Sequence, residues 1–540
     1  MISESSEIEF ISHRESLRRA DRVGIATGVL LLLFLGFWRS RNCIFWGDEL
    51  FGLFVLKAPS FSRMMYLWNH GLDGSGLFFF LLGRPWIALL GSSELSLRMF
   101  SAVAVAGAFV FVWLSARRFY PIWVVAAATS YVFLVNECLR WQLSNGRSYG
   151  IFMLAAAATV YLLFRAGDER GAPAWLLFLT FCTHLLLTGS QSFGIAYSAA
   201  LLGALVVLDM YFRRFRPALY LSVMAGWSVL FFCWNNIIAT AAVSKDGFWT
   251  VRPALRDFLL GQTVFDHNVS VMILLLFGLL GIVSLRFRRA RISSYVIIIS
   301  LLLVDAVFFI KSLFGLSIYA NRYLLPLSIA SVFLLCEALT QIMEYASIPE
   351  KLRRALPIVV FILAILAYAH SIAVKDLLPF SDYTPKLLAS LPSGLPIVDC
   401  DLTTFVDIEF YHQSSVTQIY YPIDWDIAHD PKSVVDGVHD FGGYHEMENW
   451  KSAGFYTQDI LSTGELLGGV KDFVLIVDER RDFWAKKWVF NNPRYLALHT
   501  STFNSPFYGP LAIWIVHRQA NDIVHGSAPK TDGKTGTERQ

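Results

Sequence analysis

The amino-acid sequence predicts an α-helical polytopic membrane protein with a C-terminal α/β domain outside the membrane. Of the 540 residues, 55% are hydrophobic and 16% are charged, whereas soluble domains have about 45–50% apolar and about 25% charged residues. The 16 Trp and 44 Phe are typical of a large lipid-facing surface with interfacial belts. A net charge of +3 gives no electrostatic footprint for nucleic acid. This composition excludes a disordered chain, a collagen-like fibre and an ordinary cytosolic enzyme.

The first membrane span is expected at residues 23–38, after a basic N-terminal tail, 1–22, on the cytoplasmic side. Arg39, Ser40 and Arg41 follow it where a signal peptide would have a small-residue cleavage site, so the span is retained. Further apolar runs, extended by flanking aromatic residues toward the ~20 residues that a span needs, fall at 99–115, 121–135, 148–164, 174–189, 193–212, 218–240, 269–285, 292–310, 323–343 and 355–374. The sequence therefore predicts about eleven transmembrane helices within 23–374.

The run 77–90 is ambiguous because Arg84 and Pro85 interrupt it. If it lies on the outer surface, the inside loops and tail hold 18 Lys and Arg residues, and the four short outer loops hold seven. If the run 77–90 crossed the membrane, every later loop would lie on the opposite side, and most basic residues would be outside, against the positive-inside rule. We therefore expect an interfacial helix within a long first outer loop, 39–98, with the N-terminus inside and the C-terminus outside.

The chain changes character after the last span. Short strand-like runs alternate with helical stretches over 375–520, which predicts an extracytoplasmic α/β domain. The end, 521–540, is rich in Gly, Lys, Thr and Ser and is expected to be a disordered tail.

Candidate reactive residues lie in the predicted outer loops. Asp48 and Glu49 are adjacent carboxylates among apolar residues, where burial is costly unless they are paired or functional. The same topology brings further polar residues to this side, namely His70, Asp73, Glu137, Arg140, Arg147 and Arg322. Arginine binds phosphate bidentately and a carboxylate can accept a proton, so this set suits a reaction on an anionic, lipid-linked substrate. The alternative is that these residues form structural ion pairs between loops.

The order of these segments resembles the glycosyltransferases of the C superfamily (GT-C), in particular family 39: protein O-mannosyltransferases, the lipid A aminoarabinose transferase and related lipopolysaccharide sugar transferases. The resemblance implies that Asp48 is the catalytic base, with Glu49 beside it. Asp73 matches the start of a segment that leads into an interfacial helix, although the prolines of that family segment are missing here. Glu137 and Arg147 match elements of the second outer loop.

Arg322 and Tyr323 match an Arg-Tyr element before a proline, and the resemblance implies that this arginine lies near the donor phosphate. The expected site therefore has Asp48, Glu49 and Glu137 as catalytic residues and Arg322, Arg147 and Tyr323 around the phosphate. Asp73, His70 and Arg140 are expected to bind substrate.

The resemblance implies an inverting transferase. The absence of eukaryotic-type retention signals and the short inside loops predict that it lies in a bacterial inner membrane. Its donor would be a polyprenyl-phosphate sugar and its acceptor a hydroxyl on a cell-envelope glycolipid or polysaccharide rather than a protein. No cofactor is required, since the donor has one phosphate, although Asp48 and Glu137 could share a divalent metal ion. A transporter or flippase of a lipid-linked sugar is the alternative, but the sequence lacks the internal hydropathy symmetry typical of transporters. A disulfide between Cys43 and Cys138 stays open.

Overall fold

The computed structural model describes residues 4–41, 43–169, 171–243, 252–260, 291–315, 317–345, 349–374, 382–416, 418–428, 442–478, 489–490, 492, 494–505 and 509–519. The chain forms two compact units. The first consists of Met1–Asp382 with Val438–Phe455, and the second consists of Tyr383–Gly437 with Tyr456–Gln540. The sequence analysis assigns 375–520 to one outer domain, which stays a prediction, and the segment Val438–Phe455 belongs to the first unit.

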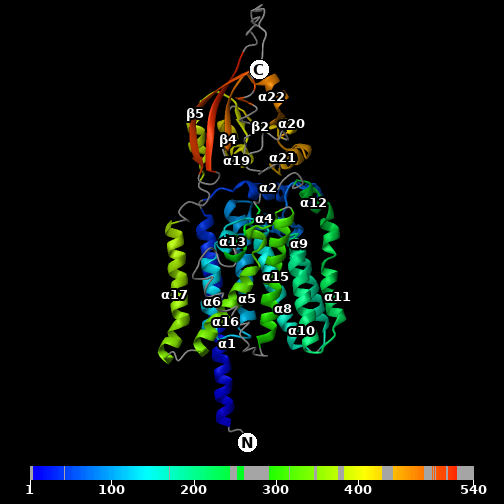
Figure 1. Ribbon diagram of the computed structural model, residues 1–540, viewed down its shortest axis with the longest axis vertical. Coiled ribbons are helices and arrows are strands. Elements are labelled where there is room, and N and C mark those ends of the chain that lie inside the picture. The colour runs from blue at the N-terminus through cyan, green and yellow to red at the C-terminus, as the bar shows by residue number, and fades with distance from the viewer. Residues whose placement is uncertain are drawn as a thin grey trace, which may run out of the picture. The chain divides into compact units, whose positions relative to one another are not determined.

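The first unit is a bundle of apolar helices (Figure 1). Within the described residues, the helices long and apolar enough to cross a membrane lie in α1 (Glu4–Ser40), α5 (Glu94–Ala116), α8 (Tyr149–Asp168), α10 (Gly194–Tyr211), α11 (Pro217–Gly226) with α12 (Val229–Val243), and α15 (Ile292–Phe314). Shorter apolar stretches lie in α4 (Leu77–Leu90), α6 (Ile122–Val135), α9 (Ala174–Ser190), α16 (Leu327–Tyr345) and α17 (Glu350–Val374). All the predicted spans except 269–285 fall on these helices, and 269–285 lies outside the described residues. The prediction of a polytopic helical membrane protein is confirmed.

Short helices connect the long ones at the end of the bundle where α1 ends. They are α2 (Gly47–Leu56), α3 (Phe61–Asn69), α7 (Glu137–Gln142), α13 (Leu255–Leu260) and a 3₁₀ turn, η2 (Asn321–Tyr323). Here α5, α8 and α16 begin and α6 and α9 end, so loops far apart in sequence meet at one end (Figure 1).

Helix α4 begins and ends at this same end of the bundle. A Cβ at Gly76, its N-cap, would lie 2.3 Å from the backbone of Ser190, the last residue of α9. Near its other end, the Trp86 indole donates to the Ser96 carbonyl in the first turn of α5 at 2.8 Å. The helix thus leads from the end of α9 to the start of α5 without crossing the bundle, as the distribution of basic residues predicts.

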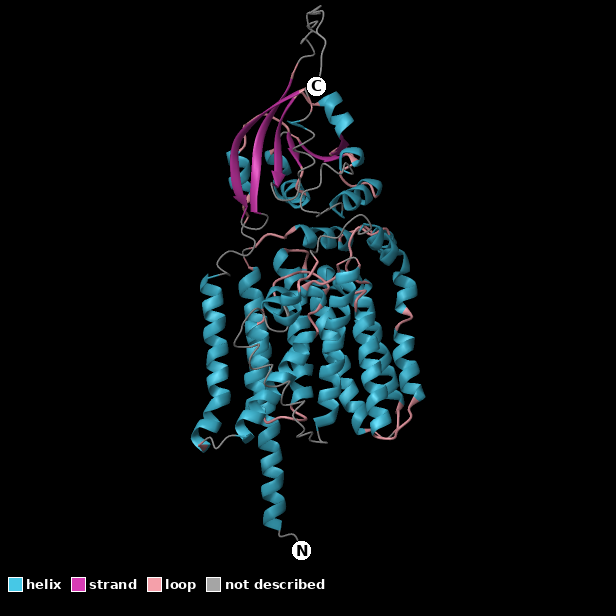
Figure 2. Cartoon of the chain, in the orientation of Figure 1, coloured by secondary structure: helices cyan, strands magenta, loops and turns pink. Residues whose placement is uncertain are grey.

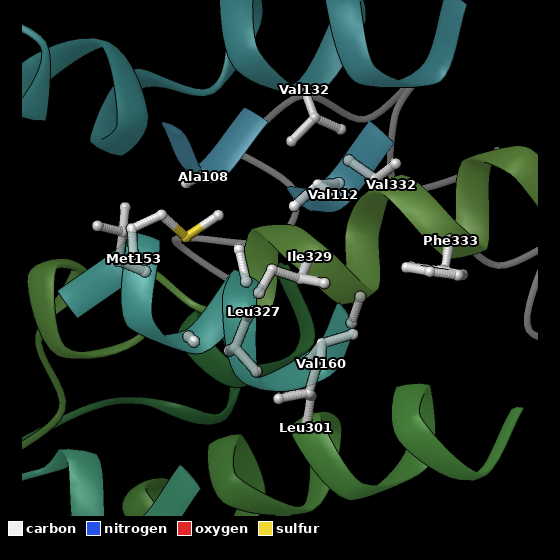
Figure 3. Packing of buried hydrophobic residues seen from close by; sticks show 14 of the residues in the cluster. Ala108, Val112, Val132, Met153, Val160, Leu301, Leu327, Ile329, Val332 and Phe333 are labelled. Atoms are coloured by element: carbon white, nitrogen blue, oxygen red, sulfur yellow. The ribbon is translucent and has the colours of Figure 1, made fainter. Parts of the chain in front are cut away.

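Tight packing of small and branched side chains holds the bundle together. Figure 3 shows Val112 of α5, Val132 of α6, Met153 of α8 and Phe333 of α16 within one buried cluster. At the α5–α8 crossing, a Cβ on Gly150 would lie 2.7 Å from the Ser101 carbonyl oxygen. Because lipid offers no hydrophobic drive for helices to associate, such close contacts are the main source of stability inside a membrane.

At the opposite end of the bundle, several of the described basic residues of the predicted inside loops are paired with acids. Arg216 forms a bidentate pair with Asp209, at 3.0 and 2.5 Å. The Glu337 carboxylate of α16 accepts from Arg291 at 3.1 Å and from the Tyr120 hydroxyl at 3.0 Å. These pairs fix helix ends far from the loops that hold Asp48.

The second unit is a small α/β domain with a six-stranded sheet, drawn in magenta in Figure 2. Its strands are β1 (Ile397–Asp399), β2 (Ile419–Ile423), β3 (Ile460–Ser462), β4 (Asp472–Asp478), β5 (Tyr495–Ser505) and β6 (Gly509–Arg518), in the order β3-β2-β1-β4-β6-β5. The first four in this order are parallel, and β6 and β5 form an antiparallel edge. The described helices and 3₁₀ turns of the C-terminal part are α18 (Thr384–Ser390), α19 (Leu402–His412), η3 (Gln413–Ser415), α20 (Trp425–Ala428), α21 (Gly442–Ser452) and α22 (Thr463–Gly469). The predicted α/β domain is confirmed, and the predicted tail 521–540 lies outside the described residues.

Candidate active site

The site is built around the first turn of α2, which carries Asp48 and Glu49. Acidic side chains are favoured at this position because the helix N-terminus has a partial positive charge. The two neighbours nevertheless have very different surroundings.

Glu49 is completely buried. Its two oxygens accept from Arg98 of α5, with Oε1 3.0 Å from Nε and Oε2 2.6 Å from Nη2. Oε1 also accepts from the Gly146 amide at 2.5 Å, and Oε2 accepts from the Trp46 amide at 3.3 Å. With four donors, this carboxylate is a structural anchor that ties α2 to α5 and to the turn before α8.

Arg98 was not among the residues that the sequence singled out. Its side chain is fully buried, and besides Glu49 it donates to the carbonyls of Cys43 at 3.1 Å and Ile44 at 2.5 Å. It therefore fixes the chain leading from α1 into α2. The sequence does contain a signal for Arg98. It is a lone arginine at the start of an apolar run, and such a residue needs a partner.

Asp48 keeps 27% of its side chain exposed. Within the described part of the chain, its carboxylate has one hydrogen-bond donor, the Arg322 guanidinium, with Nη1 3.1 Å from Oδ2. The backbone carbonyl of Asp48 accepts from Arg147. Asp48 is thus the accessible member of the pair, and its backbone and its side chain each contact an arginine.

Arg147 joins Asp48 to Asp73. Its guanidinium forms an ion pair with the buried Asp73 carboxylate, whose other oxygen accepts from the Ser75 amide at 2.5 Å. Burial lowers the pKa of the Arg147 guanidinium, but Asp73 and then Asp48 raise it, and the net pKa lies above its ordinary value. This arginine therefore stays charged in a buried position.

Asn236 of α12, another residue that the sequence analysis did not identify, holds the turn that carries Asp73. Its amide donates to the Trp68 carbonyl at 2.6 Å and to the Asp73 carbonyl at 3.2 Å. In the same turn, Gly71 has a φ of +74°, and a Cβ there would lie 2.8 Å from the Cβ of Ala239. An asparagine inside an apolar run gives no sequence signal for a partner so distant in the chain.

Arg322 lies on η2 between aromatic rings. Its guanidinium carbon is 5.6 Å from the ring centre of Tyr323 and 5.9 Å from that of Tyr149, within the range of cation–π attraction. The Tyr323 carbonyl accepts from the Tyr197 hydroxyl at 3.0 Å, and its ring lies 4.4 Å from that of Phe193. These contacts fix the turn that presents Arg322 to Asp48.

Three other predicted site residues lie at helix ends around this network. His70 is exposed at the end of α3, with Nδ1 2.7 Å from the Tyr66 carbonyl. Glu137 is the exposed first residue of α7, and Arg140 is buried with its guanidinium carbon 5.9 Å from the Tyr368 ring centre. Asp48, Asp73, Arg147 and Arg322 are joined to one another by the contacts described above.

The described residues contain no group of three or more His, Cys, Asp or Glu side chains that could hold a metal ion. Metal independence stays a prediction. Cys43 and Cys138 are not joined by a disulfide, since the Cys43 sulfur lies 3.0 Å from the Arg39 carbonyl and the Cys138 sulfur 3.4 Å from that of Asn321.

No protein-family profile and no curated protein matches this sequence. Solved structures do match its fold. ArnT from Cupriavidus metallidurans in the apo state superposes with a TM-score of 0.52 at 11% identity, over 91% of this chain and 97% of that one. The same protein bound to undecaprenyl phosphate gives 0.50 at 13% identity, with the same coverage.

The archaeal oligosaccharyltransferase AglB from Archaeoglobus fulgidus, in complex with an inhibitory peptide and a dolichol-phosphate, gives 0.50 at 13% identity, over 94% of this chain and 75% of that one. Both are GT-C glycosyltransferases. The chain has the GT-C fold. This confirms the fold that the order of sequence segments predicts, and at such low identity the likeness extends to the fold alone.

Proposed function

We propose that the protein is an inverting glycosyltransferase that moves a sugar from a polyprenyl phosphate to an acceptor hydroxyl. One observation carries the proposal, and it concerns two adjacent carboxylates. Glu49 is buried with four donors, whereas Asp48 is accessible and, among the described residues, its carboxylate accepts from one arginine, Arg322. The arrangement supports a base next to a phosphate-binding cation.

Asp48 is the proposed general base. The acceptor oxygen attacks the anomeric carbon, its proton passes to the Asp48 carboxylate, and the bond between the anomeric carbon and the phosphate oxygen breaks. The electron pair of that bond stays on the phosphate, which leaves as polyprenyl phosphate. One displacement inverts the anomeric centre, and general-base help of this kind typically contributes ~10²–10⁴-fold to the rate.

Arg322 is the proposed contact for the leaving phosphate. Its guanidinium is paired with Asp48 at 3.1 Å. When Asp48 takes the proton, its attraction for Arg322 falls, while negative charge grows on the phosphate. The same guanidinium therefore binds the phosphate more strongly in the transition state than in the ground state, which is the condition for catalysis.

Arg147 adds a second fixed positive charge and holds the backbone of Asp48. Tyr323 flanks Arg322, and Asp73 holds Arg147 in place. We assign Glu137, His70 and Arg140 to binding of the acceptor or the sugar, and Glu49 to holding the base. The scheme uses no metal ion, because a donor with a single phosphate can be neutralised by the two arginines.

The comparisons support the class of donor, since the ArnT structure holds undecaprenyl phosphate and the AglB structure holds a dolichol-phosphate. The apolar helices make this a membrane protein. The excess of Lys and Arg in the loops opposite Asp48 supports a site on the periplasmic face of a bacterial inner membrane. The proposed acceptor is a cell-envelope glycolipid or polysaccharide.

A reconstitution experiment tests this function against a flippase. The purified protein is placed in liposomes with radiolabelled undecaprenyl-phosphate hexoses and pentoses and an extract of envelope lipids and glycans. Label in a new glycan or glycolipid with release of undecaprenyl phosphate supports transfer. Movement of the intact donor between leaflets without new glycosidic bonds would replace the transferase with a flippase.

A further inference from the structure

The segment 442–455 comes from the C-terminal part of the chain but belongs to the first unit. Its helix α21 buries residues at a spacing of three, Tyr444, Met447 and Trp450, followed by Ala453. Three-residue spacing places them on one helix face. Within the first unit, α21 contacts α12, and Trp450 packs on α2.

Trp450 is the centre of this contact, and none of its surface is exposed. Its ring centre lies 5.0 Å from that of Phe51 and 5.1 Å from that of Phe54, both on α2. Phe455 adds ring contacts at 5.2 Å to Trp450 and 5.9 Å to Phe54. An aromatic cluster from residues near 450 therefore packs on the helix that carries Asp48.

The segment is also held at its end. Arg63 of α3 donates to the Ala453 carbonyl, which follows the last turn of α21. The next residues turn sharply, with a φ of +91° at Gly454 and +48° at Tyr456. A left-handed φ at a tyrosine is unfavourable unless the surroundings impose it. Tyr456 is the first residue of the returning second unit, and its ring lies 5.5 Å from that of Phe405 in the same unit. The chain thus leaves the segment through a constrained turn.

The direction of these contacts matters for Asp48. Successive residues of a helix are about 100° apart, so Phe51 and Phe54 lie on the face of α2 opposite Glu49, and Asp48 lies between the two faces. Arg98 holds α2 through Glu49 on one side. Trp450 holds it through Phe51 and Phe54 on the other.

We propose that Trp450 is a positioning residue that fixes the rotation of α2 and so keeps the Asp48 carboxylate aligned with Arg322. This inference rests on the proposed function for its effect on catalysis. Arg322 and Arg147 come from η2 and from the turn before α8, not from α2. Loss of Trp450 therefore lowers turnover while binding of the lipid phosphate is kept.

Three full-length variants test the proposal: Trp450→Ala, Trp450→Phe, which keeps an aromatic ring, and Trp514→Ala as a matched control. Trp514 lies on β6 of the second unit, against Phe490 and His499 at 4.6 and 4.7 Å. Hydrogen exchange of residues 47–56 is measured in detergent, together with undecaprenyl phosphate binding and donor turnover.

We expect at least about tenfold faster exchange in α2 for Trp450→Ala, from loss of its two ring pairs there, and wild-type exchange for Trp514→Ala. We expect Trp450→Ala to lower kcat at least about tenfold, with undecaprenyl phosphate affinity within about twofold of wild type. We expect Trp450→Phe to recover turnover. Unchanged exchange in α2, or equal loss of turnover in both alanine variants, would overturn the inference. Absence of transfer by the wild type contradicts the proposed function, and the exchange comparison still tests the contact.

Discussion

At the residue scale, Asp48 and Glu49 differ because only one of them has its lone pairs filled. A carboxylate that must take a proton needs an open approach, and Asp48 retains one beside Arg322. Glu49 instead neutralises Arg98, a charge with no exposed surface in an apolar bundle. The two side chains therefore predict different consequences of mutation.

Glu49→Gln is expected to destabilise the protein, because it leaves Arg98 buried without its counter-charge. Removing one partner of a buried pair typically costs about 3–5 kcal/mol. Thermal unfolding in detergent measures this loss of stability. Asp48→Asn is the matched change on the neighbouring, partly exposed carboxylate. We expect a large fall in Tm for Glu49→Gln and a small one for Asp48→Asn, and the reverse order would remove Glu49 from its anchoring role.

Arg322→Lys is expected to weaken binding of undecaprenyl phosphate by about tenfold, since an ammonium cannot replace the planar, bidentate guanidinium. Arg118→Lys is the control, because Arg118 pairs with Asp168 at the opposite end of the bundle. Native mass spectrometry of the purified protein with undecaprenyl phosphate measures both. Equal affinity of Arg322→Lys and wild type would exclude Arg322 from the phosphate site.

At the residue level, the sequence indicates which loop residues lie close together where sidedness alone decides proximity, and the roles of these residues stay predictions. Asp48, Asp73, Arg147 and Arg322 lie in loops that the basic-residue rule places at one end, and there they form one network. Arg98 and Asn236 lie at or inside apolar runs, and their partners are chosen by helix packing that a single sequence does not reveal. Burial of Glu49 beside exposed Asp48 depends on the rotation of α2, which also follows from packing.

At the element scale, α4 is an apolar helix that begins and ends at the same end of the bundle. Arg84 near its middle donates to the Ala58 carbonyl at 3.0 Å, which gives this charge a protein partner in an apolar helix. Length and apolar composition do not distinguish α4 from α6, since both are apolar helices of 14 residues. The distribution of basic residues between inside and outside loops does distinguish them, because one more crossing would move every later loop to the other side of the membrane.

Gly76→Ala is expected to destabilise the α4–α9 contact, because its Cβ would lie 2.3 Å from the backbone of Ser190. Backbone atoms cannot move away as the end of a flexible side chain can. Overpacking of this kind typically costs about 1–3 kcal/mol. Gly74→Ala is the control, where the Cβ would meet only the Thr240 methyl at 3.5 Å. Thermal unfolding of both variants measures the difference, and equal Tm values would contradict the close approach.

At the scale of the whole molecule, the C-terminal part of the chain contributes to both units, with Val438–Phe455 in the first and the remainder after Asp382 in the second. Alternating strands and helices predicted its α/β domain, but they did not predict that α21 packs with the bundle. The buried stripe of Tyr444, Met447 and Trp450 is equally consistent with a helix covering a sheet. The sequence pattern specifies that this face is buried and leaves its partner undetermined.

The second unit is expected to lose stability as the pH rises. Burial, and then the nearby Asp459 carboxylate, raise the pKa of Glu409 to about 7. Since this pKa lies above the ordinary value of 4.5, the folded unit binds the proton more tightly than the unfolded chain. The stabilisation is complete below about pH 4.5 and is lost as the pH rises through about 7.

Hydrogen exchange of α19 in the full chain, between pH 5 and 8, measures this after correction for intrinsic rates. The wild type is expected to lose protection over this range, and Glu409→Gln, which stays neutral, is expected to show a flatter profile. An identical pH dependence in both proteins would contradict the assignment to Glu409.

The central claim for the whole molecule is that Asp48 accepts the proton of an acceptor hydroxyl while a sugar leaves a polyprenyl phosphate. Its most direct test is the transfer rate of folded, liposome-reconstituted Asp48→Asn against wild type, with labelled undecaprenyl-phosphate sugars and envelope extract. The account predicts transfer by the wild type and a loss of about 10²-fold or more in kcat for Asp48→Asn, with undecaprenyl phosphate binding retained. Near-normal transfer by Asp48→Asn would contradict it.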